Sequence, residues 1–156
     1  MLETFTNGEI FSLQVDKKDE KGNILSPSPL RELSKLDVPA KVGIRIARLI
    51  RKLSQEIEPI NDVRNKLILK YGVKDEKGQT VINAAVPQFE AFSEEHNSLM
   101  KQTTKIEFEK VVLPDEVHVA LDVLVALEPF LAVADIPGIS TSSNGVAKEV
   151  PELVTK

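Results

Sequence analysis

Five basic side chains in the first half of the chain are the strongest candidates for binding chemistry. Four of them follow one another at gaps of four, three and four residues, which places them on one face of a helix. The set is Lys41, Arg45, Arg48, Arg51 and Lys52. Such a face can bind phosphates with an affinity that falls as salt is added. The alternative is a solvated face, or one that pairs with the acidic C-terminal half of the same chain or of a neighbouring subunit.

The distribution of charge along the chain favours that alternative. Residues 35–52 contain six basic residues and one acidic residue, whereas residues 90–156 contain twelve acidic and five basic residues. The net charge of the 156 residues is −4, which gives no overall signature of nucleic-acid binding. The sequence also shows no helix-turn-helix motif, aromatic platform or glycine-rich phosphate loop. Nucleic acid therefore remains the second choice of partner.

The other reactive residue types do not assemble into a recognisable site. His96 and His118 each stand alone in their segments, and the chain has no cysteine. The strings KDEKGN and KDEKGQ, which begin at Lys18 and Lys74, raise the question of a calcium loop. Neither string has the alternating oxygen ligands and the final glutamate of an EF-hand, so we interpret both as turns. We therefore predict that the chain is not an enzyme and has no catalytic residues, no metal site and no cofactor.

The basic residues lie in the longest periodic segment of the sequence. Apolar residues recur every three or four positions from Val38 to Tyr71, as on one face of a long helix. Pro39 fits the first turn of this helix, and Gly72 is a residue that commonly follows a helix end. Pro59 interrupts the segment and predicts a kink in the preceding turn, or two helices that meet there.

A second helix is predicted over residues 86–101, with Asn83 as its cap or Pro87 in its first turn. The connection from the long helix is only about a dozen residues long, and connections this short usually join neighbouring antiparallel helices. We therefore expect residues 39–71 and 86–101 to pack as an antiparallel helical hairpin.

After residue 101, the spacing of the apolar residues changes from the helical period of 3.6 residues to a period of 2. Ile106 and Phe108 alternate with Glu107 and Glu109, which predicts a half-buried strand. Pro114 ends this strand, and apolar residues at helical spacing follow it. They predict a final helix over about residues 116–133 that includes His118 in its first turn.

The N-terminal segment permits two interpretations. The alternation in residues 9–15 indicates a strand that could form a hairpin with residues 23–26. Thr6 and Glu9 instead have the spacing of a capping box, which would start a short helix. We favour the strand, followed by an exposed SPSP connection into a short helix over residues 30–36.

Together these elements predict an α+β fold that is mainly helical with minor β structure. It contains the antiparallel long-helix hairpin, a short sheet or β-hairpin and a C-terminal helix. We expect a single globular domain over residues 1–137, built from a β-hairpin-like segment (1–29), the helical hairpin (30–103) and a strand plus helix (104–137). Residues 138–156 have linker composition and predict an extended tail. No signal peptide or membrane span is evident.

Several short strings give the central segment the character of a motif. They are a Pro-Ala-Lys helix start, an I-A-x5-L run, an R-N-x-L-I-x-K-Y-G run and a K-D-E-x-G turn. The positions are Pro39, Ala40, Lys41, Ile46, Ala47, Leu53, Arg64, Asn65, Leu67, Ile68, Lys70, Tyr71, Gly72, Lys74, Asp75, Glu76 and Gly78. In these residues the chain resembles a family of small uncharacterised proteins of tailed bacteriophages and prophages, and IEFEKVVLPDE resembles the strand before that family's last helix.

The resemblance covers roughly residues 30–130 and departs from the family pattern in the segment DKKDEKGNILSPSP and after Gly138. It implies a phage setting and no catalytic residues. We therefore expect a non-enzymatic structural or assembly accessory protein, a virion component that binds other phage structural proteins or further copies of itself. The alternative is an intracellular phage protein that binds nucleic acid or modulates the host through the basic helix face. The expected location is the virion or the host cytoplasm.

Overall fold

Helices and four two-stranded sheets make up the part of the chain that this computed structural model describes, residues 1–133. The α+β fold class is therefore correct. The tail expected over residues 138–156 lies outside the described residues. In chain order the elements are β1 (Leu2–Thr6), α1 (Asn7–Ser12), β2 (Lys17–Lys18), β3 (Ile24–Ser26), α2 (Pro29–Ser34), α3 (Ala40–Tyr71), β4 (Val73–Lys74), β5 (Thr80–Val81), α4 (Gln88–Lys101), β6 (Thr103–Glu107), β7 (Val111–Leu113), α5 (Leu121–Leu127), the 3-10 helix η1 (Glu128–Phe130) and β8 (Leu131–Val133).

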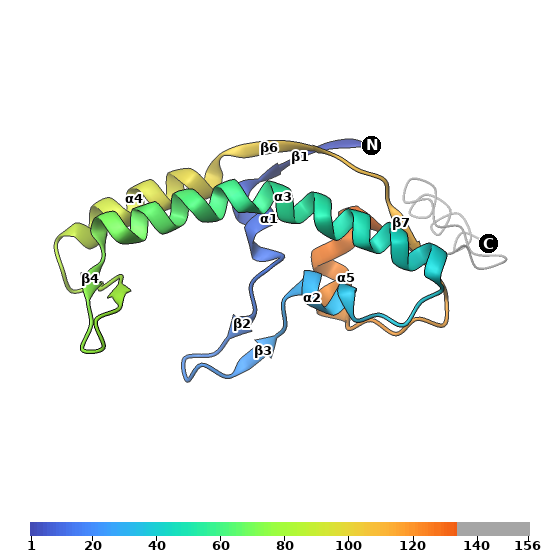
Figure 1. Cartoon of the computed structure of the whole chain (residues 1–156), viewed down its shortest axis with the longest axis horizontal. Helices are drawn as coiled ribbons and strands as arrows, with labels where there is room; N and C mark the ends of the chain where they lie inside the picture. Colours follow the sequence, from blue (N-terminus) through green and yellow to red (C-terminus); the bar gives the residue numbers. More distant parts are fainter. Residues whose placement is uncertain (134–156) are drawn as a thin grey trace, which may run out of the picture.

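The helix α3 runs along the length of the molecule, and the other elements pack around it (Figure 1). It is a single helix of 32 residues, so the alternative of two helices meeting near Pro59 is wrong. Pro59 lies on the exposed side, where the missing backbone hydrogen bond faces water rather than the core. The opposite side is buried at Ile46, Leu49, Leu53, Ile57, Ile60 and Leu67, which follows the predicted periodicity.

The helix α4 runs back beside the C-terminal half of α3 (Figure 1). The Tyr71 hydroxyl donates a hydrogen bond of 2.5 Å to Glu95, and the Lys70 ammonium lies 3.4 Å from the same carboxylate. Because α4 has 14 residues against the 32 of α3, it covers only part of the long helix. A hairpin of two long helices is therefore not confirmed.

The N-terminal segment pairs with β6 rather than with its own neighbours. Strands β1 and β6 are antiparallel, with Leu2 opposite Glu107 and Thr6 opposite Thr103. The strand that we favoured over residues 9–15 is wrong, because α1 begins at Asn7. The capping box explains this outcome: the Thr6 backbone N–H donates to the Glu9 carboxylate at 2.7 Å, and the Glu9 N–H donates to the Thr6 hydroxyl at 3.1 Å.

The buried Asn7 side chain joins three elements at this point. Its amide nitrogen donates to the Leu99 carbonyl at 2.9 Å, and its amide oxygen accepts from the Thr104 hydroxyl at 2.9 Å. The Asn7 backbone N–H donates to the Gln102 carbonyl at 2.7 Å. These bonds fix the start of α1 against the turn between α4 and β6.

The single strand predicted around residues 106–109 is followed in the structure by a second, separate strand, because the alternation of buried residues changes phase after Phe108. Ile106 and Phe108 are buried, and the next buried residues are Val111 and Leu113. A step of three instead of two ends β6 and starts β7, which pairs in parallel with β8. The segment between the two strands carries two consecutive exposed residues. This short irregular segment lies directly over α3.

The final helix expected over residues 116–133 is also wrong in its extent. Helix α5 covers only Leu121–Leu127, and the chain then continues as η1 and β8. Pro129 accounts for the early end, because it cannot donate the hydrogen bond that would continue the α-helix. Phe130 instead enters the core, where its ring centroid lies 5.1 Å from the centroid of Phe5 and 4.8 Å from the centroid of Phe108.

The two KDEKG strings form the same turn at the tips of two separate hairpins, β2–β3 and β4–β5. In each tip the aspartate, Asp19 or Asp75, accepts two backbone N–H groups at 2.8–2.9 Å through one carboxylate oxygen. Each tip ends with a glycine at positive φ, Gly22 at 86° and Gly78 at 79°. The interpretation of the strings as one turn used twice is confirmed, and both hairpins extend away from α3 (Figure 1).

Candidate interaction groove

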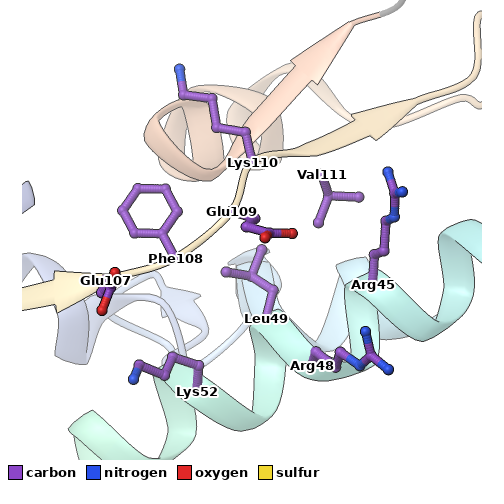
Figure 2. A pocket seen from close by; sticks show the side chains of 9 residues that line it. All are labelled: Arg45, Arg48, Leu49, Lys52, Glu107, Phe108, Glu109, Lys110 and Val111. Carbon is purple, nitrogen blue, oxygen red and sulfur yellow. The ribbon is translucent and has the colours of Figure 1, made fainter. Parts of the chain in front are cut away.

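A groove of about 380 Å³ lies between the N-terminal half of α3 and the segment 107–111. Figure 2 shows the segment passing over the helix, with charged side chains on both walls. We call this feature the charged groove. Its lining residues are Arg45, Arg48, Leu49, Lys52, Glu107, Phe108, Glu109, Lys110 and Val111.

The helical wall places three cations beside an apolar floor. Arg45, Arg48 and Lys52 are separated by three and four residues, so they project from the same side of α3. Leu49 lies between them in sequence and is buried, because its side chain packs into the core below the segment. The helix therefore presents positive charge at the edge of the groove and a leucine within it.

The opposite wall is a consequence of the phase change between β6 and β7. Phe108 and Val111 turn inward to the core, which leaves Glu109 and Lys110 exposed between them. In Figure 2 the Glu109 side chain is directed toward α3 above Leu49, whereas the Lys110 side chain is directed away from the helix. Glu107 completes this wall at the end nearer Lys52.

The structure divides the basic face that the sequence predicted. Arg45, Arg48 and Lys52 come together at the charged groove. Lys41 and Arg51 are exposed on α3 but do not line it. Three of the five predicted residues therefore lie at the groove, and two lie outside it.

The cations and carboxylates of the groove are not paired with one another. The ion pairs within 4 Å among residues 1–133 are Arg31 with Asp16, Lys35 with Glu32 and Lys70 with Glu95. Across the groove, opposite charges attract through water, where each contact contributes little. Arginine and lysine donors with no carboxylate bound can bond to a ligand at little cost to the fold.

The groove is lined by charged and apolar side chains. Its lining includes no histidine, serine, threonine or tyrosine, and its polar side chains are those of arginine, lysine and glutamate. Within residues 1–133 no three His, Asp or Glu side chains lie close enough to hold a metal ion. Arginines can instead form paired, charge-assisted hydrogen bonds with carboxylates or phosphates.

The titratable groups with shifted pKa values in α3 and α4 lie away from the groove. The hydrogen bond from the Tyr71 hydroxyl lowers the pKa of Glu95, and the nearby Lys70 acts in the same direction. Burial lowers the pKa of His96, with the charge of Arg64 as a second cause. These groups lie in or beside the contact between α3 and α4.

The structure places the two histidines in different surroundings. His96 stacks on Phe92, one turn earlier in the same helix, with a centroid distance of 5.3 Å. His118 lies in the loop before α5 and not in a helical turn. It lines a separate shallow cavity with Pro114 and Leu124.

Sequence reasoning missed the acidic wall of the groove. Glu107 and Glu109 were assigned only as the solvent side of a continuous strand. The available signal was the step from Phe108 to Val111, which breaks the alternation and indicates an irregular segment with both Glu109 and Lys110 outside.

A scan against protein-family models, a search of curated proteins and a search of solved structures each returned no match. None of the helices in the described part of the chain is both long and apolar enough to cross a bilayer.

Proposed function

We propose that this chain is a non-enzymatic structural or assembly accessory protein of a tailed bacteriophage that binds other phage proteins through the charged groove. The phage setting rests on the sequence resemblance at residues 30–130. The observation that carries the binding role is the groove itself, in which cations and carboxylates stand on facing walls without pairing.

The mixed charge of the groove favours a protein partner over a polyanion. Glu107 and Glu109 lie opposite the cations of α3, and a phosphate backbone, which is charged at every unit, would meet both carboxylates, whereas a protein segment can carry its charges at selected positions only. A protein segment can offer hydrogen-bond donors and acceptors in one stretch, so it can satisfy both walls.

The rest of the fold supplies a rigid support for this surface. In the proposal, α3 and the shorter α4 act as an antiparallel helical hairpin that holds the groove at one end. Leu53, at 0% exposure, and Leu49 anchor the helical wall in the core. A rigid wall loses little conformational freedom on binding, which favours affinity.

Mass spectrometry of purified phage particles and of assembly intermediates tests the proposed function. We expect the chain in one of these fractions, cross-linked through Lys52 or Lys110 to another phage protein. Absence of the chain from both fractions would contradict a structural or assembly role in the virion or the host cytoplasm.

A second candidate, nucleic-acid binding or host modulation through the basic face, is favoured by one observation. Lys41 and Arg51 lie outside the groove, away from Glu107 and Glu109, and are free to contact phosphates. Electrophoretic mobility shifts with duplex and single-stranded oligonucleotides at rising salt test this function. Binding that weakens steeply with salt and on both Arg48→Glu and Arg51→Glu supports it, and salt-insensitive or absent binding contradicts it.

A further inference from the structure

We infer that the charged groove takes an extended, acidic segment of a partner protein, with two carboxylates on the α3 wall and an apolar side chain on the floor of the groove. This inference rests on the proposed protein-binding function and names the chemistry of the partner. The alternatives, a basic segment or a nucleic acid, are outcomes of the test below.

The balance of charge selects an acidic ligand. Three cations from α3 line one wall against the two carboxylates of Glu107 and Glu109, while the Lys110 side chain points away from the helix. The lining residues therefore carry a positive excess, and a negative segment gains attraction that a basic one loses. Two of the cations are arginines, whose planar groups bind carboxylates through two parallel hydrogen bonds.

The spacing of the cations fits alternate residues of an extended chain. Side chains three or four residues apart on a helix have Cβ atoms about 5–6 Å apart, which applies to Arg45 and Arg48 and to Arg48 and Lys52. Residues i and i+2 of an extended segment lie on one face about 6.5–7 Å apart. A segment with carboxylates at alternate positions therefore matches neighbouring cations of α3.

The floor and the size of the groove complete the argument. Leu49, Phe108 and Val111 provide buried apolar surface between the charged walls. The volume of about 380 Å³ is near the lower end of ligand pockets, which range over about 300–1,000 Å³. It suits a few residues of a peptide with one small apolar anchor, such as valine or leucine.

A selection from a random linear peptide display library against the full chain tests the inference. We expect enrichment of peptides with Asp or Glu at alternate positions beside an aliphatic residue. The most enriched peptide is then synthesised, and its binding is measured by fluorescence anisotropy at low and high salt. Affinity should fall with salt, because the contacts are ionic and exposed at the rim.

Matched variants locate the contact. Arg48→Glu should weaken binding of the acidic peptide about tenfold or more, since it removes a charge-assisted bond of about 1.5–3 kcal/mol. Arg51→Glu makes the same change of charge on the same helix but outside the groove, and should alter affinity less than about twofold. Glu109→Lys should tighten binding, because it removes a repulsive carboxylate, and such a gain cannot arise from misfolding.

Several results would overturn the inference. They are enrichment of basic or uncharged peptides, no enrichment at all, equal losses in the Arg48→Glu and Arg51→Glu variants, or no gain from Glu109→Lys. A further such result is an oligonucleotide that displaces the acidic peptide and loses affinity equally in the Arg48→Glu and Arg51→Glu variants. That result would show that the ligand of this surface is a nucleic acid. The peptide assay does not use phage particles, so its failure is distinct from absence of the chain from particles.

Discussion

The two halves of α3 use the same kinds of charged side chain in opposite ways. In the C-terminal half, Lys70 and Tyr71 both contact Glu95 of α4 at the exposed edge of the contact between the two helices. In the N-terminal half, Arg45 and Arg48 face a strand segment with two glutamates, and no pair within 4 Å forms across the gap among the described residues.

This difference indicates what each half contributes. Where a charge is paired and hydrogen-bonded, its removal changes the packing of two helices. Where charges of both signs face a groove without pairing, we expect their removal to change the stability of the fold little. The exposed charges in the N-terminal half of α3 therefore belong to the proposed binding surface, whereas those in the C-terminal half lie in a contact between two helices.

The largest effect is expected from breaking the support that both halves share. Leu53 is 0% exposed at the centre of α3, and Leu53→Ala should lower the free energy of unfolding by about 3 kcal/mol through lost burial and a residual cavity. Leu69 is 71% exposed on the same helix, so Leu69→Ala should stay within about 0.5 kcal/mol. Urea unfolding measures both, and equal effects would contradict the burial of Leu53.

A smaller loss is expected from opening the polar contact beside α4. Asn7→Ala removes the partner of the Leu99 carbonyl and of the Thr104 hydroxyl, so the free energy of unfolding should fall by about 2 kcal/mol. Asn97 is exposed on α4, and Asn97→Ala is the matched control, with a change within about 0.5 kcal/mol. Amide hydrogen exchange should show the largest loss of protection in α1 and β6 of the Asn7 variant.

The comparison is tested directly by one charge reversal in each half. Lys70→Glu places a second carboxylate beside Glu95 and should lower the melting temperature measurably, because attraction becomes repulsion. Arg48→Glu should leave the free energy of unfolding within about 0.5 kcal/mol of the original chain. A loss of stability in Arg48→Glu that equals the loss in Lys70→Glu would show that the groove, too, is a structural contact.

The smallest expected effect is a pH dependence of the free energy of unfolding that arises from His96, beside the C-terminal half of α3. Because burial lowers the pKa of His96 below 6.5, the unfolded chain takes up this proton first as the pH falls. Stability should therefore decline as the pH falls below about 6.5. His96→Gln should remove this part of the decline in urea unfolding at pH 7.5 and 5.5, and an unchanged decline would exclude His96 as its source.

Much of the fold could be predicted because local signals agreed with tertiary packing. The periodicity from Val38 to Tyr71 predicted the buried side of α3, and the aspartates and glycines predicted both hairpin tips. The strand over residues 9–15 was wrong because alternation in a short segment competes with a capping box, and only the pairing of β1 with β6 decides between them. Local periodicity carries no information about such a distant partner.

The site was half predictable for the same reason. The cations Arg45, Arg48 and Lys52 lie on one helix, and helical spacing is a local property that a sequence shows directly. Glu107 and Glu109 join them only because the chain returns over α3 about 60 residues later, and this return depends on the packing of Phe108 with Phe5 and Phe130. Long-range packing of that kind has no counterpart in spacing.

The duplicated turn at Asp19 and Asp75 offers two matched positions for a spectroscopic label. Both tips share the two backbone N–H bonds to the aspartate and the glycine at positive φ, so a fluorophore or spin label attached at Lys21 or at Lys77 would have the same linker and a similar local backbone. Any difference between the two signals would then report the surroundings of each hairpin and not the label. A distance measured between the paired labels would follow how β2–β3 moves relative to β4–β5 when a ligand enters the groove.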